Sequence, residues 1–379
     1  MGEAKRVVVL GLGDTGLLVA LGLGKRFEVT ALTPRPFFLS AQNAGGRLAS
    51  PETWERIGKI ATRRFRRLDP VRIVQGLAQA VDLDARTVTY RTPAGTAETL
   101  RYDALVLATG ADNGFWRRTL LEGSDEEDAR RAAERARLQA AERIAVVGGG
   151  GSGVSLAASL AERFRDKRIR LFHGGERLLP VHHPRVATKA RDHLERLGVE
   201  VRLGHRAALP DGDAADRMAE GPVTWTTGQP PEDADLVLWA LGRARPNSGF
   251  LPPELLDADG FVPVRPTLQL PAHDEVFCVG DLAATDPLRS SARNGGTAVV
   301  VANVTKLLRG RPATRTYRAP KHRWGELVTS PRDGMLLFTP SGRRVRMANW
   351  FLRPVILDFV LFRLIYGGVR SRDDEEAAG

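Results

Sequence analysis

The sequence predicts an α/β protein with two Rossmann-like units, each made of a buried strand, a glycine-rich turn, a helix and a second strand. The first unit opens with "RVVVLGLGDTGLLVALGLG" at residues 6–24, and the second opens with "RIAVVGGGGSGVSLAASLAERF" at residues 143–164. Both opening strands are runs of β-branched and apolar residues, the pattern of a strand buried on both faces of a parallel sheet. At 379 residues the chain is too long for one small core, so we expect two or three domains.

The first glycine turn has the G-x-G-x-x-G spacing of a dinucleotide-binding turn, with Gly11, Gly13 and Gly16. In such a turn the first glycine permits the tight bend, the second lets the backbone approach a pyrophosphate, and the third lets helix and strand pack closely. The acidic residue that usually binds a ribose 2′-hydroxyl would fall near Thr33, and no carboxylate is there. We therefore expect adenosine ribose binding at this site to be weaker or differently made.

The second turn repeats this plan with Gly148, Gly150 and Gly153, and the strand that follows its helix ends at His173, again without the acid. A single G-x-G-x-x-G is weak evidence, because a glycine-rich turn without a ligand has the same letters. Two copies, each between a strand and a helix, favour two dinucleotide sites. Electron transfer between two bound dinucleotides is the simplest use of such a pair.

Three further buried strands agree with this interpretation. The stretch "YDALVLATG" ends in small residues that let the chain pass close to a cofactor, namely Ala108, Thr109 and Gly110. The similar stretch "ADLVLWALGRARPN" contains Gly242 and would return the chain from the second unit. In "HDEVFCVGDLAAT", Asp281 stands at a strand end, where its carboxylate can accept hydrogen bonds from ribityl or ribose hydroxyls. Each stretch alone fits an ordinary buried strand, but their order along the chain supports two cofactor sites.

Composition limits the partners and the chemistry. The net charge of +11 favours contact with something anionic, such as a phosphate-bearing cofactor, a nucleic acid or a membrane face. The one cysteine, Cys278, permits no internal disulfide and no dithiol chemistry, and we expect it to be buried in a strand. The chain start lacks the features of a secretion signal, and no window reaches the roughly 20 apolar residues that cross a bilayer. These features predict a cytoplasmic protein.

From Lys5 to about Arg370 the motifs resemble the two-dinucleotide-binding-domain flavoproteins, and are most similar to the ferroptosis-suppressor proteins and the type II NADH dehydrogenases. The resemblance implies a glutathione-reductase-like architecture, in which FAD lies along the first domain and an NAD(P)H-binding domain is inserted into it. The implied FAD-binding domain covers residues 1–112 and 244–320. Residues 113–243 would form the NAD(P)H-binding domain, and residues 321–379 a C-terminal domain.

The same resemblance implies roles for individual residues. It places the FAD pyrophosphate at the first glycine turn, residues 108–110 near the flavin, and Asp281 on the ribityl chain. In "FFLSAQNAGGRLAS", Arg47 would lie close to FAD, although it also fits a solvated loop charge. The segment "SARNGGTAVVVANV", which contains Asn294, resembles a helix whose positive end points at the flavin and stabilises its reduced form.

Two departures from the family pattern are the missing acid at Thr33 in the first site and the residue at position 155 in the second. The family usually has a glutamate near the nicotinamide, and the matching position is Ser155. A neutral His173 does not repel a 2′-phosphate and Arg177 is close in sequence, so both NADH and NADPH stay open; His173 also fits a simple strand cap. Adjacent histidines at His182 and His183 would point to opposite faces of a strand, so we predict no metal site.

The chain also has two charged segments outside the glycine units. After Arg343, "RRVRMANWFLRPVILDFVLFRLIYGGVRSR" mixes large apolar residues with arginines, and helical spacing would gather the apolar ones on one face. Such a segment fits an anionic membrane surface, but it also fits packing on the protein's own core or a homodimer contact. The connector "EGSDEEDARRAAERARLQAAE" at residues 122–142 predicts a solvated helix.

These observations favour an FAD-dependent oxidoreductase that passes a hydride from NAD(P)H to FAD and then two electrons to a quinone-like acceptor, in contact with the inner face of a membrane. No side chain need act as a nucleophile. A first alternative is a reductase for a ferredoxin-like protein, which the basic surface would suit. A second is a redox-controlled nucleic-acid-binding flavoprotein, as the resemblance to apoptosis-inducing flavoproteins allows. Aromatic residues interleaved with lysines are not evident, so we expect no nucleic-acid partner.

Overall fold

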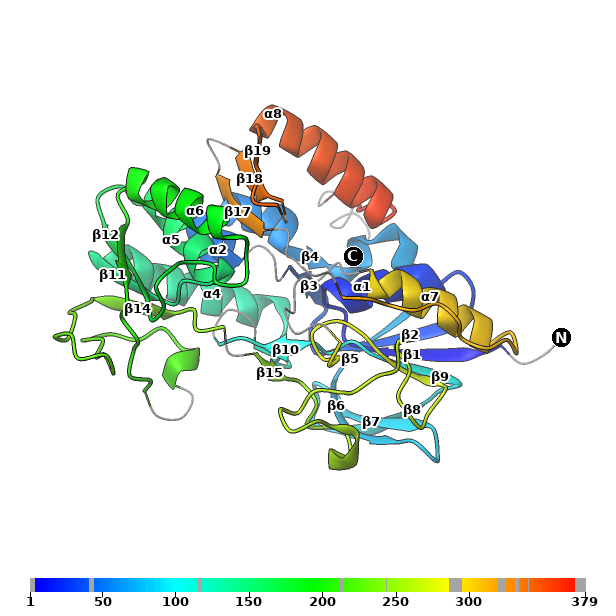
Figure 1. Cartoon of the computed structure of the whole chain (residues 1–379). Helices are drawn as coiled ribbons and strands as arrows, with labels where there is room; N and C mark the ends of the chain where they lie inside the picture. Colours follow the sequence, from blue (N-terminus) through cyan, green and yellow to red (C-terminus); the bar gives the residue numbers. More distant parts are fainter. Residues whose placement is uncertain are drawn as a thin grey trace.

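Two parallel sheets, one for each glycine turn, form the framework of the computed structural model, which describes residues 4–40, 44–114, 118–210, 214–242, 244–285, 295–319, 325–330, 334–339 and 341–371 (Figure 1). The first sheet has the order β16-β9-β1-β2-β5, with all pairings parallel. Its strands are β1 (Arg6–Leu10), β2 (Glu28–Thr33), β5 (Arg72–Gln75), β9 (Ala104–Leu107) and β16 (Val276–Cys278). Helices α1 (Asp14–Leu23) and α7 (Gly296–Leu307) lie side by side on one face of this sheet.

The second sheet has the order β13-β12-β11-β14 and is also parallel throughout. Its strands are β11 (Arg143–Val147), β12 (Arg168–His173), β13 (Glu200–Leu203) and β14 (Leu236–Trp239). The helices after β11 and β12 are α5 (Gly151–Arg163) and α6 (Pro184–Arg196). The order β14-β11-β12-β13 matches β9-β1-β2-β5, so both predicted Rossmann-like units are confirmed.

Smaller elements connect and cover the two units. The first unit carries an antiparallel sheet of β6 (Leu77–Asp82), β7 (Thr87–Arg91) and β8 (Ala97–Arg101), together with the pair β3 (Phe37–Leu39) and β4 (Lys59–Ala61). The chain leaves this unit through β10 (Ala111–Asp112) and returns through β15 (Arg245–Pro246), and these two strands pair with each other. Short helices are α2 (Ala44–Ala49), α3 (Pro51–Thr53), η2 (Trp54–Gly58), η3 (Thr62–Arg64), η4 (Arg66–Leu68), η5 (Ala214–Asp216) and η6 (Pro253–Leu255).

The connector helix α4 (Ser124–Ala140) is not a purely solvated helix, and that prediction was wrong for one of its faces. Glu127 and Leu138 are fully buried, and Arg131 is nearly so. The buried face packs against α2, whose residues Leu48 and Ala49 belong to the core around α5. Because α4 and α5 both hold α2, this short helix is fixed between the two units.

The C-terminal segment begins as a sheet and ends as a helix. Strands β17 (Gly325–Ser330), β18 (Gly334–Phe338) and β19 (Arg344–Met347) form an antiparallel sheet against α5. The helix follows as α8 (Asn349–Phe351) and η7 (Leu352–Ile365). Arg344 and Arg346 therefore lie on a strand and Arg343 in the turn before it, which corrects the prediction that they share the helix with the apolar residues.

One face of the C-terminal helix belongs to the core of the first unit. Leu361 and Tyr366 are buried there, and the ring centroid of Tyr366 lies 5.2 Å from that of Phe65 and 6.0 Å from that of Phe38. The opposite face is open to solvent, with exposed fractions of 79% for Trp350, 56% for Leu364 and 48% for Phe359. Packing on the protein's own core is thus confirmed for Leu361 and Tyr366, whereas contact of the exposed residues with a membrane or a second subunit stays a prediction.

Two further predictions have definite outcomes. Cys278 is fully buried in β16, as expected, and burial raises the pKa of its thiol. His182 and His183 are not in a strand, because His183 is the N-cap of α6, where its Nδ1 accepts a hydrogen bond from the Arg185 amide at 3.2 Å. Among the described residues, no helix combines the length and apolar character needed to cross a membrane.

Candidate dinucleotide sites

Backbone contacts fix the first glycine turn. Gly11 has a φ of +93°, and a Cβ placed on it would lie 2.6 Å from the Ala108 carbonyl oxygen. A Cβ on Gly16 would lie 1.8 Å from the Gly11 carbonyl oxygen. Because real Cβ atoms do not approach backbone this closely, both positions require glycine. Gly13 differs, since nothing lies within 4 Å of where its Cβ would be, and this open space fits the phosphates of a dinucleotide at the N-terminus of α1.

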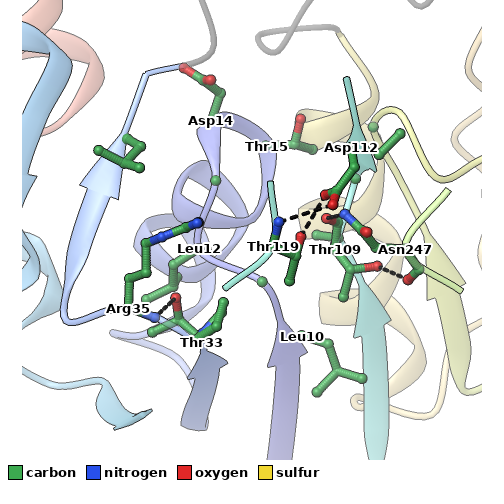
Figure 2. A pocket seen from close by; sticks show the side chains of 18 of the residues that line it. Leu10, Leu12, Asp14, Thr15, Thr33, Arg35, Thr109, Asp112, Thr119 and Asn247 are labelled. Carbon is green, nitrogen blue, oxygen red and sulfur yellow. Dashed lines mark hydrogen bonds between the residues drawn. The ribbon is translucent and has the colours of Figure 1, made fainter. Parts of the chain in front are cut away.

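A cavity of about 410 Å³ extends from this turn between the ends of β1, β2 and β9 (Figure 2). Its volume falls within the range of about 300 to 1,000 Å³ of ligand sites. The cavity reaches Ala108, Thr109 and Gly110, as the sequence predicted, and it also reaches Asp281 at the end of the β16 segment. These residues come from three different parts of the chain, so the structure brings most of the predicted first-site residues together.

Hydrogen bonds hold the floor of the cavity where the chain crosses between units. The Thr109 hydroxyl donates to the Asn247 carbonyl oxygen at 2.8 Å, and the Asn247 side-chain amide donates to the Thr109 carbonyl oxygen at 3.1 Å. Nearby, both Asp112 carboxylate oxygens accept hydrogen bonds from Thr119, at 2.8 and 3.1 Å (Figure 2). The departing and returning chains are therefore joined directly beneath the cavity.

A row of alternating charges includes three arginines of the cavity wall, and we call it the charge row. It consists of Arg35, Glu122, Arg130, Glu134 and Arg47. The successive ion pairs are 2.6, 3.1, 3.5 and 2.8 Å long, and all three arginines line the cavity. With three positive and two negative members, the row has a net charge of +1, which suits an anionic ligand.

Arg47 is not a solvated loop charge. It lies in α2 with 4% of its surface exposed, and burial lowers its pKa while Glu134 opposes that shift. Burial likewise raises the pKa of Glu134, which the neighbouring arginines counteract. The sequence did not reveal Arg130 as a wall residue, or Glu122 and Glu134 as partners of the wall arginines, because charges in a polar helix have no spacing that marks a buried partner. The Arg130–Glu134 separation of four was the one available signal.

The second glycine turn has the same backbone geometry as the first. Gly148 has a φ of +126°, and its Cβ would lie 2.1 Å from the Ala240 carbonyl oxygen. A Cβ on Gly153 would lie 1.8 Å from the Gly148 carbonyl oxygen, whereas a Cβ on Gly150 would meet nothing within 4 Å. Gly242, with a φ of +70°, follows β14 just as Gly110 follows β9. This turn therefore also fits a pyrophosphate.

His173 is in contact with the second turn. It ends β12 as predicted, and its Nδ1 accepts a hydrogen bond from the Gly149 amide at 3.2 Å. Burial lowers the pKa of His173, which a hydrogen bond to the Arg177 backbone opposes. The Arg177 side chain donates to the Pro180 carbonyl oxygen at 2.8 Å. Ser155 is half-buried in the second turn of α5, and Asn294 lies outside the described residues.

Two parallel-sheet units with matching glycine turns define the two-dinucleotide-binding-domain flavoprotein reductases. The profile of the pyridine nucleotide-disulphide oxidoreductases matches residues 5–305, and the chain belongs to this family. It is an oxidoreductase, and the predicted cofactors, FAD and NAD(P)H, are those of the family.

Named relatives agree with the resemblance found in the sequence. The chain is 29% identical over 332 residues to the type II NADH:quinone oxidoreductase NdhA of Mycobacterium tuberculosis, covering 74% of this chain and 67% of that protein. It is 27% identical over 249 residues to ferroptosis suppressor protein 1 of Taeniopygia guttata, covering 64% of this chain and 65% of that protein. The curated relatives are matched over 36% to 91% of their length.

A solved structure confirms the fold. The reductase in the covalent putidaredoxin reductase–putidaredoxin complex has a TM-score of 0.65 and 22% identity, with 89% of this chain and 82% of that chain covered. At this identity the likeness concerns the arrangement of strands and helices alone. The predicted fold class is therefore confirmed by both family and structure.

Proposed function

We propose that FAD occupies the first site and NAD(P)H the second, and that the protein passes two electrons from NAD(P)H to a quinone-like acceptor. One observation carries this proposal: at both turns the middle glycine faces open space while the outer two are closed by backbone. A bound flavin supplies the ability to accept a hydride and release electrons. The chain's own residues would hold the pyrophosphates and line the cavity.

The first test is the cofactor content of the purified protein. We expect a yellow protein that releases FAD on denaturation and whose flavin absorbance bleaches without oxygen when NADH or NADPH is added. Colourless protein that takes up no FAD would overturn the proposal.

The proposed division at residues 112 and 243 is supported by the β10–β15 pairing, which joins the two connections at these points.

The cysteine content of the chain limits the classes of electron acceptor that the protein can use. The chain's single cysteine is fully buried in β16, so a dithiol beside the flavin is not available within this chain. A small apolar acceptor, a protein partner or dioxygen remains. The uncovered face of the C-terminal helix favours the apolar acceptor, because a quinone with a long prenyl chain is met at a membrane surface.

We propose that this face docks on anionic lipid. Trp350, Phe359 and Leu364 are exposed, and each buried large apolar side chain contributes about 1.5 to 3 kcal/mol. Arg56 and Arg363 lie on or beside the helix, where they can meet headgroups; Arg56 is also paired with Asp358 at 2.6 Å. Removing the whole segment is a poor test, since Leu361 and Tyr366 belong to the core.

Point variants test docking without damage to the core. Trp350→Ser with Leu364→Ser should lower co-sedimentation with phosphatidylglycerol vesicles at least about tenfold, given the apolar area lost. The control is Val181→Ser with Leu209→Ser, two exposed apolar residues of the second unit, at 46% and 41%. Equal binding by both pairs would remove the docking proposal, and loss of a dimer in the first pair would identify the face as a subunit contact.

The basic surface favours one alternative, a reductase for a ferredoxin-like protein, because the charge of +11 suits an acidic carrier. This alternative predicts fast, salt-sensitive reduction of a protein acceptor and no preference for vesicles. Salt-sensitive DNA retention with negligible NAD(P)H turnover would instead favour nucleic-acid binding.

A further inference from the structure

The end of β2 lacks the group that normally binds the adenosine ribose. In this fold a carboxylate at that point accepts a hydrogen bond from the ribose 2′-hydroxyl. Thr33 stands there with 4% of its surface exposed, and its hydroxyl oxygen faces the Arg35 amide at 3.5 Å. A buried hydroxyl that faces a neighbouring backbone amide is a poor replacement for the carboxylate as a hydrogen-bond acceptor for the ribose.

Arg35 is the charged residue that lines the cavity next to this strand end. It follows β2 by two residues and lines the cavity together with Leu12 and Gly13 of the glycine turn. Figure 2 shows its side chain rising from the end of β2 beside Leu12. The side chain is only 14% exposed, so the guanidinium is largely enclosed.

The guanidinium is held in place by the connector between the two units. Arg35 Nε donates to the Glu122 carboxylate at 2.6 Å, and Nη2 donates to the Arg118 carbonyl oxygen. Glu122 is itself fixed, because its amide donates to the Pro34 carbonyl oxygen at 3.2 Å and its carbonyl accepts from the Gln75 side chain at 3.1 Å. Among the described residues, Arg35 Nη1 has no hydrogen-bond partner.

We propose that Arg35 recognises the adenosine ribose of FAD by donating a hydrogen bond from Nη1 to the 2′-hydroxyl oxygen. Glu122 is the positioning residue that aims the guanidinium. The site thus replaces an acceptor with a donor, and the planar, preorganised guanidinium loses little freedom on binding. This inference rests on the proposed function, which puts FAD in the first site.

The test compares FAD with an analogue that lacks the adenosine 2′-hydroxyl. Full-length protein freed of flavin is titrated with each compound, and flavin fluorescence quenching reports the dissociation constant. We expect the unaltered protein to bind the analogue about tenfold more weakly than FAD, as for one hydrogen bond to a charged donor. Arg35→Ala should bind FAD about as weakly as the unaltered protein binds the analogue, and should not distinguish the two. Arg35→Lys should recover part of the distinction.

The control is Arg91→Ala, which removes the same charge from an exposed position at the end of β7 and should leave both dissociation constants unchanged. Glu122→Gln should reduce the distinction while retaining FAD, because the carboxylate no longer fixes the guanidinium. Measurements on the unaltered protein stand even if a variant folds poorly.

The possible outcomes separate the two proposals. FAD binding without any distinction from the analogue would overturn the role of Arg35 and leave the first site intact. If Arg35→Ala still bound the analogue about tenfold more weakly than FAD, the role of Arg35 in ribose recognition would also be overturned. Arg35 would then serve to hold the connector in place. Failure of the unaltered protein to bind FAD would overturn both proposals.

Discussion

The two glycine turns have nearly the same backbone but different surroundings. In both turns, a Cβ on the third glycine would lie 1.8 Å from the carbonyl oxygen of the first, and the middle glycine faces open space. The residue after the first glycine is Leu12 in one turn and Gly149 in the other. Gly149 is required because a Cβ there would lie 2.6 Å from the His173 ring. The turn itself is thus fixed by backbone packing, whereas the side chains at the end of the second strand differ between the two units.

The same backbone turn is therefore combined with two different polar groups in the two units. At the first site a charged donor, Arg35, is fixed by a carboxylate of the connector. At the second site a neutral imidazole contacts the turn directly. The imidazole of the second site is a group whose protonation can change at ordinary pH values.

The largest expected effect comes from filling each open middle position. Gly13→Val should weaken FAD binding at least about 100-fold, because the side chain occupies the space of the pyrophosphate. Gly150→Val should leave flavin bound within about twofold and slow its reduction by NADH at least about 100-fold. Flavin titration and anaerobic stopped-flow absorbance measure these two quantities.

Gly16→Ala is the contrasting variant for this pair. Its Cβ would meet backbone rather than open space, so the expected result is low soluble yield instead of a folded protein without flavin. If Gly13→Val also failed to fold, the glycine at position 13 would be needed for packing and not for binding a ligand. Rapid flavin reduction in Gly150→Val would show that the second turn does not bind the nicotinamide cofactor.

The contact between His173 and Gly149 should make the second site sensitive to pH. Burial lowers the pKa of His173, so the imidazole is neutral above its ordinary value of about 6.5 and Nδ1 accepts the Gly149 amide. As the pH falls below 6.5 and through the lowered pKa, the protonated ring can no longer accept. NAD(P)H binding should then weaken by about tenfold, as for one lost hydrogen bond.

Cofactor titrations between about pH 8 and pH 5 measure this effect. His173→Asn is the informative variant, because its side-chain oxygen can accept the same amide without titrating. We expect nearly pH-independent binding in that variant. An unchanged pH profile would exclude the His173–Gly149 contact as the cause.

The sequence predicted the parts of both sites that repeat. Two strand–turn–helix runs, the small residues at 108–110 and Asp281 after β16 all lie where the pattern placed them, because buried strands and tight turns leave regular signals. The charge row was missed because two of its pairs, Arg35 with Glu122 and Arg47 with Glu134, join residues 87 positions apart, and such pairing leaves no periodicity. The C-terminal arginines were misassigned although Arg344–Met347 alternates polar and apolar residues, the pattern of a strand.

Ser155 offers a sharper comparison with the family pattern, in which a glutamate stands near the nicotinamide. Ser155 is half-buried in α5, just after the second glycine turn. If this position faces the nicotinamide ribose, Ser155→Glu should speed flavin reduction by NADH a few-fold, by about 2 to 5 times, through an added hydrogen bond. Stopped-flow reduction rates measure it, and Ser155→Gln tests whether charge is needed. A slower rate in both variants would show that a larger side chain at this position disturbs the packing of α5 instead.

The smallest expected effect concerns the start of each sheet, where the two units repeat one more contact. An aspartate just before the fourth strand of each parallel sheet accepts a hydrogen bond from the amide of the first strand's opening arginine at 2.7 Å, as Asp103 does for Arg6 and Asp235 for Arg143. Only the second pair adds close side-chain contacts, at 2.7 and 3.2 Å, whereas the Arg6 and Asp103 side chains are 3.7 Å apart.

Hydrogen bonds from Arg143 lower the pKa of Asp235 to about 2. This depressed pKa stabilises the folded protein above the ordinary value of 3.8, and the contribution is lost as the pH falls from there toward 2. Because the pair is exposed, Asp235→Asn should lower the melting temperature at neutral pH by less than about 2 °C, with the difference vanishing in acid. Asp103→Asn should have a smaller effect, and thermal scans at several pH values compare the two. A difference for Asp235→Asn that persisted at the acid end would show that its backbone hydrogen bonds, and not the arginine pair, stabilise the second sheet.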